Sequence, residues 1–289
     1  MADYTNLKEK IERGEWAFDL AHGDYHNHTW YSDGTKSPAG VIEHAKGLGL
    51  REIAITDHDG IGGIREAQEA GARCGIDVVP GIELSTRMED GVGLHILGYG
   101  IDIDDQALNE RLASILDARM DRNYRLVAAL QEGGYDITME EIMDRPGQTY
   151  VGKPNIARAL VAKGYVESKE AAFIDIFRQP QYKAIKKARL DPADGIRMIL
   201  AAGGLPVWAH AGKTKKIGEK GSEEFYSNVH RILDYLTEAG LAGMECYYPL
   251  HDEAMTKRLC GIAEACSYFC ASATFWRRVN SAAADCSTR

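Results

Sequence analysis

Short β-prone runs alternate with amphipathic runs along much of the chain. The strands that this pattern predicts span 24–30, 51–56, 77–84, 93–99, 204–210, 243–248 and 267–273. The helices that it predicts between them span 38–47 or 38–49, 64–73, 223–238 and 252–266. Ser37 suits an N-cap and Pro38 the first position of the first of these helices. Alternation of strands and helices favours a parallel sheet.

One connection breaks this alternation. Between Leu84 and Gly93 the chain holds only a polar loop with Asp90 and Gly91, which is too short for a crossover helix. We therefore expect the sheet to be irregular at this point. The seven predicted strands fit an α/β fold, a distorted TIM-like barrel with functional residues at the strand ends. An open, doubly wound sheet fits the same pattern.

Residues 101–189 lack predicted strands. The helices predicted there span 108–131, 154–162 and 169–177. The domain boundaries that follow are an N-terminal extension at 1–22, a discontinuous barrel at 23–100 and 190–273, a helical insertion at 101–189, and a disordered or altered tail at 274–289. The insertion is rich in Lys and Arg, a composition that more often marks a solvated face than a ligand site.

Composition excludes several classes of protein. The chain has 34 Lys and Arg against 43 Asp and Glu, a net charge of −9, which disfavours a protein that coats duplex DNA. We expect no membrane span and no signal peptide, because no apolar stretch approaches the required length and the N-terminus is polar.

The cysteines indicate a reducing compartment. There are six, with no CxxC pair and without the density of a secreted scaffold, so we expect a cytoplasmic protein. Cys260, Cys266 and Cys270 could form a metal cluster. Buried small side chains on a helix and the strand after it are the simpler interpretation.

Histidines and carboxylates collect where apolar runs end. His26 and His28 are two apart on one strand and point to the same face, and the turn after that strand carries Asp33. The next strand ends at Thr56 and is followed by Asp57, His58 and Asp59. Glu83, His95 and His210 lie in or after later apolar runs, where each alone also fits a structural role.

Together these residues predict a metal centre. Imidazole and carboxylate ligands without thiolates suit Zn²⁺, Mn²⁺ or Fe²⁺, and seven such donors exceed the needs of one tetrahedral ion. At least two metal ions are therefore expected. Two adjacent ions form a clamp for in-line displacement at phosphorus, which makes phosphate ester hydrolysis the leading reaction.

The motifs at these positions resemble those of the PHP (polymerase and histidinol phosphatase) family, in its stand-alone phosphoesterase form. They read D-x-H-x-H-x-x-x-S-D-G from Asp24, T-D-H-D from Thr56, P-G-I-E from Pro80, H-I-L-G-Y-G from His95, and A-G-G-x-x-V-x-A-H ending at His210. The resemblance implies a distorted (βα)₇ barrel and two or three divalent ions, with Glu83 as a bridging ligand. The metal ligands that it implies are His26, His28, Asp33, His58, Glu83, His95 and His210.

The helical insertion makes the chain resemble one subset of the family. It is similar to that of family members acting on nucleotide 3′,5′-bisphosphates or mononucleotides, or trimming RNA from its 5′ end. Gly152 to Arg158 resembles the family's G-R-P-H-I-A-R, with Lys153 replacing Arg and Asn155 replacing His. Lys still binds phosphate but lacks the bidentate fork of Arg. By this resemblance Lys153, Arg158 and Lys183 bind the substrate.

Two departures from the family pattern occur. Its A-H-P motif reads Ala209-His210-Ala211. Its last motif, G-S-D-x-H, supplies an Asp and a His ligand, but here Thr274 and Trp276 stand at those positions. The second departure leaves open a metal-binding module with weak or no turnover.

The function that these features predict is hydrolysis of a phosphomonoester, most readily of a nucleotide or of the 5′ end of a short RNA. A histidinol-phosphate phosphatase is the main enzymatic alternative, which the insertion argues against. His251 is a candidate substrate-binding proton donor at the mouth of the site, and a surface loop histidine is as good an interpretation.

Overall fold

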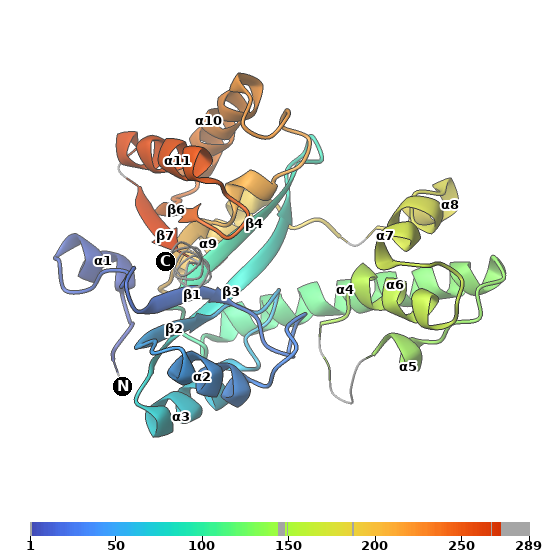
Figure 1. The fold of residues 1–289 in the computed structure, drawn as a ribbon, viewed down its shortest axis with the longest axis horizontal. Coiled ribbons are helices and arrows are strands. Elements are labelled where there is room, and N and C mark those ends of the chain that lie inside the picture. Colours follow the sequence, from blue (N-terminus) through green and yellow to red (C-terminus); the bar gives the residue numbers. More distant parts are fainter. Residues whose placement is uncertain (1, 144–147, 149, 187, 267, 273–289) are drawn as a thin grey trace, which may run out of the picture. The chain divides into compact units, whose positions relative to one another are not determined.

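Seven strands form one curled sheet whose spatial order follows the chain (Figure 1). The computed structural model describes residues 2–143, 148, 150–186, 188–266 and 268–272. The strands are β1 (Gly23–Asn27), β2 (Glu52–Ile55), β3 (Asp77–Arg87), β4 (Gly93–Tyr99), β5 (Leu205–Trp208), β6 (Gly243–Tyr247) and β7 (Phe269–Ser272). A doubly wound sheet would reverse its strand order at a switch point, so this order excludes that alternative. The fold is the predicted α/β type, a distorted TIM-like barrel.

The connection after Leu84 is a β-hairpin. β3 and β4 pair antiparallel from Gly81–Tyr99 to Arg87–Gly93, and β4 also pairs antiparallel with β5. The other neighbouring strands are parallel. β3 extends to Arg87, three residues beyond its predicted end, because the polar residues after Leu84 continue the ladder to β4.

Helices cover the outside of the barrel sheet (Figure 1). They are α2 (Pro38–Gly47), α3 (Ile64–Cys74), α9 (Pro192–Ala201), α10 (Glu223–Glu238) and α11 (Glu253–Ala265), while α1 (Leu7–Glu12) precedes β1. Ser37 Oγ accepts a hydrogen bond from Gly40 N–H at 3.0 Å, which is the expected N-cap. α9 was absent from the prediction, although Asp191 and Pro192 give it the same type of start as Ser37 and Pro38 give α2.

The barrel interior has an apolar part and a polar part. On β4, His95, Leu97 and Tyr99 alternate along the strand and therefore point to the same side. Leu97 and Tyr99 belong to a buried cluster that also contains Tyr4, Leu7, Tyr25, Ala54, Val79, Leu205, Val207, Ala209 and Ala242. The strands thus hold an apolar core and, further along the same face, the histidines described below.

The described residues from 110 to 189 form a second compact unit with its own core, and the other described residues form the first. The elements of the second unit are most of α4 (Gln106–Glu132), α5 (Met139–Ile142), α6 (Lys153–Ala162), α7 (Lys169–Ala171), a π-helical turn at Ala172–Ile176, and α8 (Pro180–Lys183). Leu126, Leu130, Ile156 and Leu160 are fully buried in that core. The described part of this unit contains no strand, and the helix predicted at 169–177 is divided between α7 and the π-helical turn.

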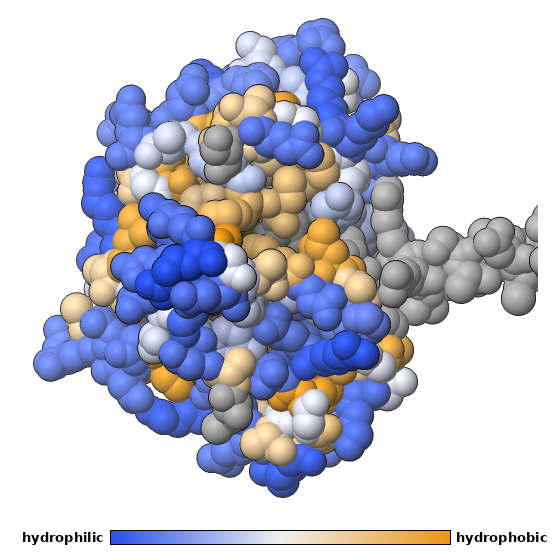
Figure 2. Space-filling view, turned by 90° about the vertical axis from the view of Figure 1, so that its left-hand side faces the viewer, coloured by the Kyte–Doolittle hydropathy of each residue, from blue (hydrophilic) through white to orange (hydrophobic). Residues whose placement is uncertain are grey.

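Figure 2 shows the face of the first unit that carries α1. Hydrophilic residues cover most of this face, and apolar residues gather near its centre. Among the described residues, every helix is too short or too polar to cross a lipid bilayer.

Gly81 lies where β2, β3 and β4 come closest. A Cβ atom there would lie 2.9 Å from Ile55 O and 3.1 Å from Gly98 O, two carbonyl oxygens that cannot move without shifting the sheet. We expect Gly81→Ala to lower the free energy of unfolding by about 1–3 kcal/mol. Gly261→Ala is the control, because Gly261 lies within α11 with no atom within 4 Å of the new Cβ. Gly261→Ala should raise the free energy of unfolding, by at most about 1 kcal/mol. Urea denaturation measures both, and equal stabilities would contradict the prediction.

Candidate metal centre

Glu83 lies at the centre of the site. Its side chain is 1% exposed, and it sits within β3 between Ile82 and Leu84. The Glu83 N–H donates to Asp57 O at 3.1 Å, and the Asp59 N–H donates to Glu83 O at 3.0 Å. These bonds anchor the Glu83 backbone to the segment after β2.

Five imidazole rings surround this one carboxylate. Oε1 lies 2.7 Å from His95 Nδ1 and 2.9 Å from His210 Nε2. The distances from Oε2 to the other three rings are 3.2 Å to His26 Nε2, 3.1 Å to His28 Nε2 and 3.1 Å to His58 Nδ1. Six of the seven predicted metal ligands therefore converge on one point.

The spacing of these atoms fits shared metal coordination. Two ligand atoms that bind one ion at about 2.1 Å, at angles between octahedral and tetrahedral, lie roughly 3.0–3.4 Å apart. Most of the distances above approach this range. Direct hydrogen bonds explain the arrangement poorly, because two carboxylate oxygens have about four lone-pair sites for five ring nitrogens.

Two groups of three ligands share Glu83. In each group, one Glu83 oxygen and one ring nitrogen of each histidine all lie within 4.8 Å of one another; the histidines are His26 and His210 in one group and His28 and His58 in the other. Because the same carboxylate belongs to both groups, it is placed to bridge two ions.

The electrostatics of the site match a cation-binding role. Burial raises the pKa of Glu83, but the nearby imidazoles outweigh it and leave that pKa well below its usual value. Burial and the neighbouring His28 and His95 rings lower the pKa of His58 to about 4. Burial also lowers the pKa of His210. Burial lowers the pKa of His26, but the Glu245 and Glu83 carboxylates outweigh it and raise that pKa well above its usual value. An ionised carboxylate and neutral imidazoles are the states that bind metal ions, so His26 would release a proton as an ion binds.

Access to the centre is graded from one side to the other. The side chains of His26 and His210 are 5% and 9% exposed, whereas those of His95 and Asp33 are 34% and 50% exposed. Asp33 Oδ1 lies 3.6 Å from His28 Nδ1, and Asp33 Oδ2 lies 3.7 Å from His58 Nε2. A substrate would reach the centre from the side of Asp33 and His95.

The strand directions explain how these residues meet. His58 and His210 follow the ends of β2 and β5, as expected for functional residues of a parallel barrel. His95 instead lies near the beginning of β4, not near its end, because β4 runs antiparallel and starts at the same edge of the sheet. His210 has φ 28°, an uncommon value for a residue other than glycine, directly before the turn at Ala211–Lys213.

The prediction missed Glu245. Glu245 lies on β6 and is fully buried. Its Oε1 lies 3.0 Å from His26 Nδ1, and its Oε2 accepts a hydrogen bond from His210 N–H at 2.6 Å. Burial raises the pKa of Glu245, but His26 outweighs it and leaves that pKa below its usual value. Its sequence signal is the same as that of Glu83, a carboxylate inside an apolar strand, and could have been recognised.

Asp57 has a supporting role. Its carboxylate accepts hydrogen bonds from the Thr29 N–H at 2.7 Å, from the Thr29 hydroxyl at 2.6 Å and from the Ser32 hydroxyl. These bonds hold the turn that carries Asp33.

His251 is buried rather than on a surface loop. Its ring is 2% exposed, Nδ1 lies 2.9 Å from Cys246 O, and Nε2 accepts a hydrogen bond from Gly212 N–H at 3.1 Å. Both ring nitrogens thus have backbone partners, and burial lowers the pKa of the ring. A proton-donor role for His251 stays a prediction that requires one of these bonds to open.

The predicted substrate-binding residues lie in the helical unit. Lys153 begins α6, with Nζ 5.1 Å above the Phe177 ring, and burial and the charge of Arg122 lower its pKa. Lys183 is exposed at the end of α8. The Arg158 guanidinium lies 3.5 Å from the carbonyl oxygens of Glu141 and Ile142.

Two arginines of α4 were missed. Arg119 and Arg122 are 5% and 6% exposed, and the Arg119 guanidinium lies 4.1 Å over the Tyr150 ring. Among the described residues, Arg122 Nε is buried without a hydrogen-bond partner. Burial lowers the pKa of Arg122 to about 10. A buried cation of this kind favours an anionic ligand.

Thr274, Trp276 and the tail predicted at 274–289 lie outside the described residues. The predictions that concern them therefore stay predictions.

We expect Glu245→Gln to weaken metal binding about 10- to 100-fold, because the amide removes the charge that orients His26. Glu253→Gln is the control, since Glu253 is an exposed carboxylate at the start of α11. Calorimetric titration of the metal-free proteins with Mn²⁺ measures the affinities. Wild-type affinity in Glu245→Gln would show that Glu245 does not position the ligands.

Three curated relatives resemble the chain over most of its length. A phosphoribosyl 1,2-cyclic phosphate 1,2-diphosphodiesterase from Eggerthella lenta is 29% identical over 243 residues, which cover 83% of this chain and 88% of that protein. A 3′,5′-nucleoside bisphosphate phosphatase from Chromobacterium violaceum is 34% identical and covers 67% and 68%. A 5′-3′ exoribonuclease from Haemophilus influenzae is 33% identical and covers 65% and 68%.

The fold and the sequence profile agree with these relatives. A crystal structure from Bifidobacterium adolescentis, of a candidate metal-dependent phosphoesterase, superposes with a TM-score of 0.75 at 31% identity, covering 89% of this chain and 88% of that one. The profile of the PHP domain matches residues 24–242, which include Glu83 and the five histidines around it. With the fold, the site and the sequence in agreement, the chain belongs to the PHP family of metal-dependent phosphoesterases.

Proposed function

We propose that this phosphoesterase hydrolyses phosphomonoesters of nucleotides, with 3′,5′-bisphosphates and mononucleotides as its main substrates. The observation that carries the proposal is the buried Glu83 carboxylate shared by two groups of histidines. A relative that is 34% identical acts on 3′,5′-nucleoside bisphosphates, and another acts on RNA from its 5′ end. A short RNA with a 5′ phosphate is therefore the next candidate substrate.

The centre would hold two divalent ions, with Mn, Fe or Zn as the candidates. His26, Glu83 and His210 would bind one ion, and His28, His58 and Glu83 the other. Asp33 and His95 would complete the coordination, and the resemblance to the family leaves room for a third ion. When bound, such ions would lower the pKa of a coordinated water and neutralise charge on the phosphoryl oxygens.

Other residues of the chain would orient the residues that bind the ions. Glu245 fixes His26 through its ring nitrogen and His210 through its backbone N–H. Asp57 holds the turn that places Asp33 at the exposed side of the centre. Each of these contacts restricts the geometry of the ligands before any substrate arrives.

A phosphate group of the nucleotide would bind to cations of the helical unit. Arg122 is buried and its Nε has no hydrogen-bond partner among the described residues, so an anion would supply the missing acceptor. Lys153 lies close enough to Arg122 for the charge of one to lower the pKa of the other. Lys183 and Arg158 are further candidates from the family resemblance.

A cyclic phosphate diester is the second candidate substrate. The Eggerthella lenta relative acts on a phosphoribosyl 1,2-cyclic phosphate and matches the chain over a larger share than the other relatives described above. Two adjacent ions serve hydrolysis of a diester as well as of a monoester.

A phosphate-release assay distinguishes these functions. The substrates are 3′-phosphoadenosine 5′-phosphate, AMP, a 5′-phosphorylated RNA, a cyclic phosphate diester and histidinol phosphate, each with added Mn²⁺. The diester assay includes a phosphomonoesterase so that ring opening also releases phosphate. The RNA assay also measures released mononucleotides, because hydrolysis of the RNA backbone frees no inorganic phosphate. We expect the bisphosphate to react fastest, a chelator to abolish turnover and Mn²⁺ to restore it.

Glu83→Ala is the matched control, because it should lose both bound metal and activity. Faster release from histidinol phosphate or the diester would replace the proposed substrate. No release from any of the five would favour a metal-binding module without turnover.

We expect Arg122→Met to lower kcat/KM for the best substrate about 10- to 100-fold, since one charge-assisted hydrogen bond to phosphate is lost. Methionine keeps the buried apolar volume. Arg125→Met is the control on the same helix, where the exposed guanidinium pairs with Asp121 at 2.9 Å. Steady-state kinetics compare the two variants, and equal effects would exclude Arg122 from phosphate binding.

A further inference from the structure

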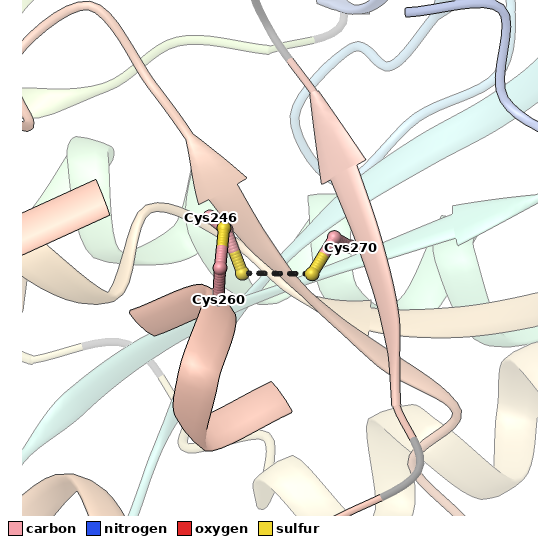
Figure 3. Close-up of side chains that lie close together, drawn as sticks. All are labelled: Cys246, Cys260 and Cys270. Atoms are coloured by element: carbon pink, nitrogen blue, oxygen red, sulfur yellow. Dashed lines mark hydrogen bonds between the residues drawn. The ribbon is translucent and has the colours of Figure 1, made fainter. Parts of the chain in front are cut away.

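Three cysteines from different elements converge on the outer face of the barrel sheet. Cys246 lies on β6, Cys270 on β7 and Cys260 on α11 (Figure 3). Their sulfur atoms all lie within 4.8 Å of one another, and the Sγ atoms of Cys246 and Cys270 are 3.4 Å apart. The sequence prediction had grouped Cys260 and Cys270 with Cys266, which is exposed and outside this cluster, and had not included Cys246.

This thiol cluster is separate from the histidine centre. Glu245 and Cys246 are consecutive on β6, so their side chains point to opposite faces of the sheet. Glu245 points into the barrel toward His26, and Cys246 points outward to α11 and β7.

We propose that Cys246, Cys260 and Cys270 form a second metal site, for a thiophilic d¹⁰ ion such as Zn²⁺ or Cu⁺. The ligand set differs from that of the histidine centre, because three soft thiolates favour d¹⁰ ions, whereas imidazole and carboxylate ligands also suit Mn²⁺ and Fe²⁺. The site would tie β6, β7 and α11 together.

The distances are those of a site that needs little rearrangement. Three thiolates that bind one ion at about 2.3 Å lie roughly 3.8–4.0 Å apart in tetrahedral or trigonal geometry. The observed separations, 3.4 Å between Cys246 and Cys270 and at most 4.8 Å for the other two pairs, lie on either side of this range. Ordinary apolar packing does not require three sulfur atoms from three elements to meet at one point.

The surroundings allow an ion to enter. Cys246 is fully buried, whereas Cys260 and Cys270 are partly exposed and give access from solvent. The hydrogen bond from the Cys246 thiol lowers the pKa of Cys270 to about 7, although burial and the nearby Glu264 carboxylate oppose this shift. Coordination would release the remaining thiol protons to solvent as the sulfur atoms bind the ion.

Titration of the reduced protein with Co²⁺ tests the proposal. Cobalt bound by thiolates gives a near-ultraviolet charge-transfer band, which nitrogen and oxygen ligands do not produce, so binding at the histidine centre does not interfere. We expect the band in the wild type, its loss in Cys246→Ser, Cys260→Ser and Cys270→Ser, and its retention in the control Cys266→Ser. Competition with Zn²⁺ or Cu⁺ identifies the preferred ion by the concentration that removes the band.

Alkylation of the wild type gives a second measurement that requires no variant to fold. Zn²⁺ or Cu⁺ should protect the partly exposed Cys260 and Cys270 from iodoacetamide and leave Cys74 and Cys266 reactive, as mapped by peptide mass. Absence of the cobalt band in the wild type, or its persistence in the three cluster variants, would overturn the proposal. A Cys246–Cys270 disulfide in freshly isolated protein, with no metal bound after reduction, would also overturn it.

Discussion

The structure depends on one buried negative charge. Glu83 is 1% exposed and carries its carboxylate inside the barrel, where five imidazole rings approach it to between 2.7 and 3.2 Å. Isolated burial of a carboxylate costs several kcal/mol or more unless cations or hydrogen bonds compensate it. The histidines at the strand ends meet this requirement, and the Glu245 carboxylate behind His26 raises the pKa of that ring, which favours its positive charge. The fold itself therefore creates a site that favours cations.

The β3–β4 hairpin is the departure from barrel regularity that makes the arrangement possible. A parallel β4 would present its last residues to the site and would need a crossover helix to reach it. The antiparallel turn lets β4 present His95 from its first residues, directly beside Glu83, with no intervening helix to cover the opening. His95 and Asp33 are also the most exposed of the predicted ligands, so a substrate would reach the centre from their side.

Much of this could be predicted from residue patterns, for identifiable reasons. His26, His58, Glu83 and His210 stood out because each is an ionisable group in or directly after an apolar run, and a strand end is a local signal. Glu245 carries that signal and was still missed, because no neighbouring histidine in the sequence drew attention to it. The partnership of Arg119 with Tyr150, and of Cys246 with Cys260 and Cys270, depends on contacts between elements that no local pattern encodes. α9 was missed because Asp191 and Pro192 start it without a preceding strand.

The helical unit has a core of its own, built around residues such as Leu130 and Ile156. Because each unit has its own core, substitutions in one unit need not destabilise the other. A substitution near Glu83 would disturb five imidazole rings that approach one carboxylate. The helical unit can exchange surface residues while its interior stays folded. A second core thus offers a part of the chain that can change without disturbing the histidine centre, in a protein whose described relatives act on three different substrates.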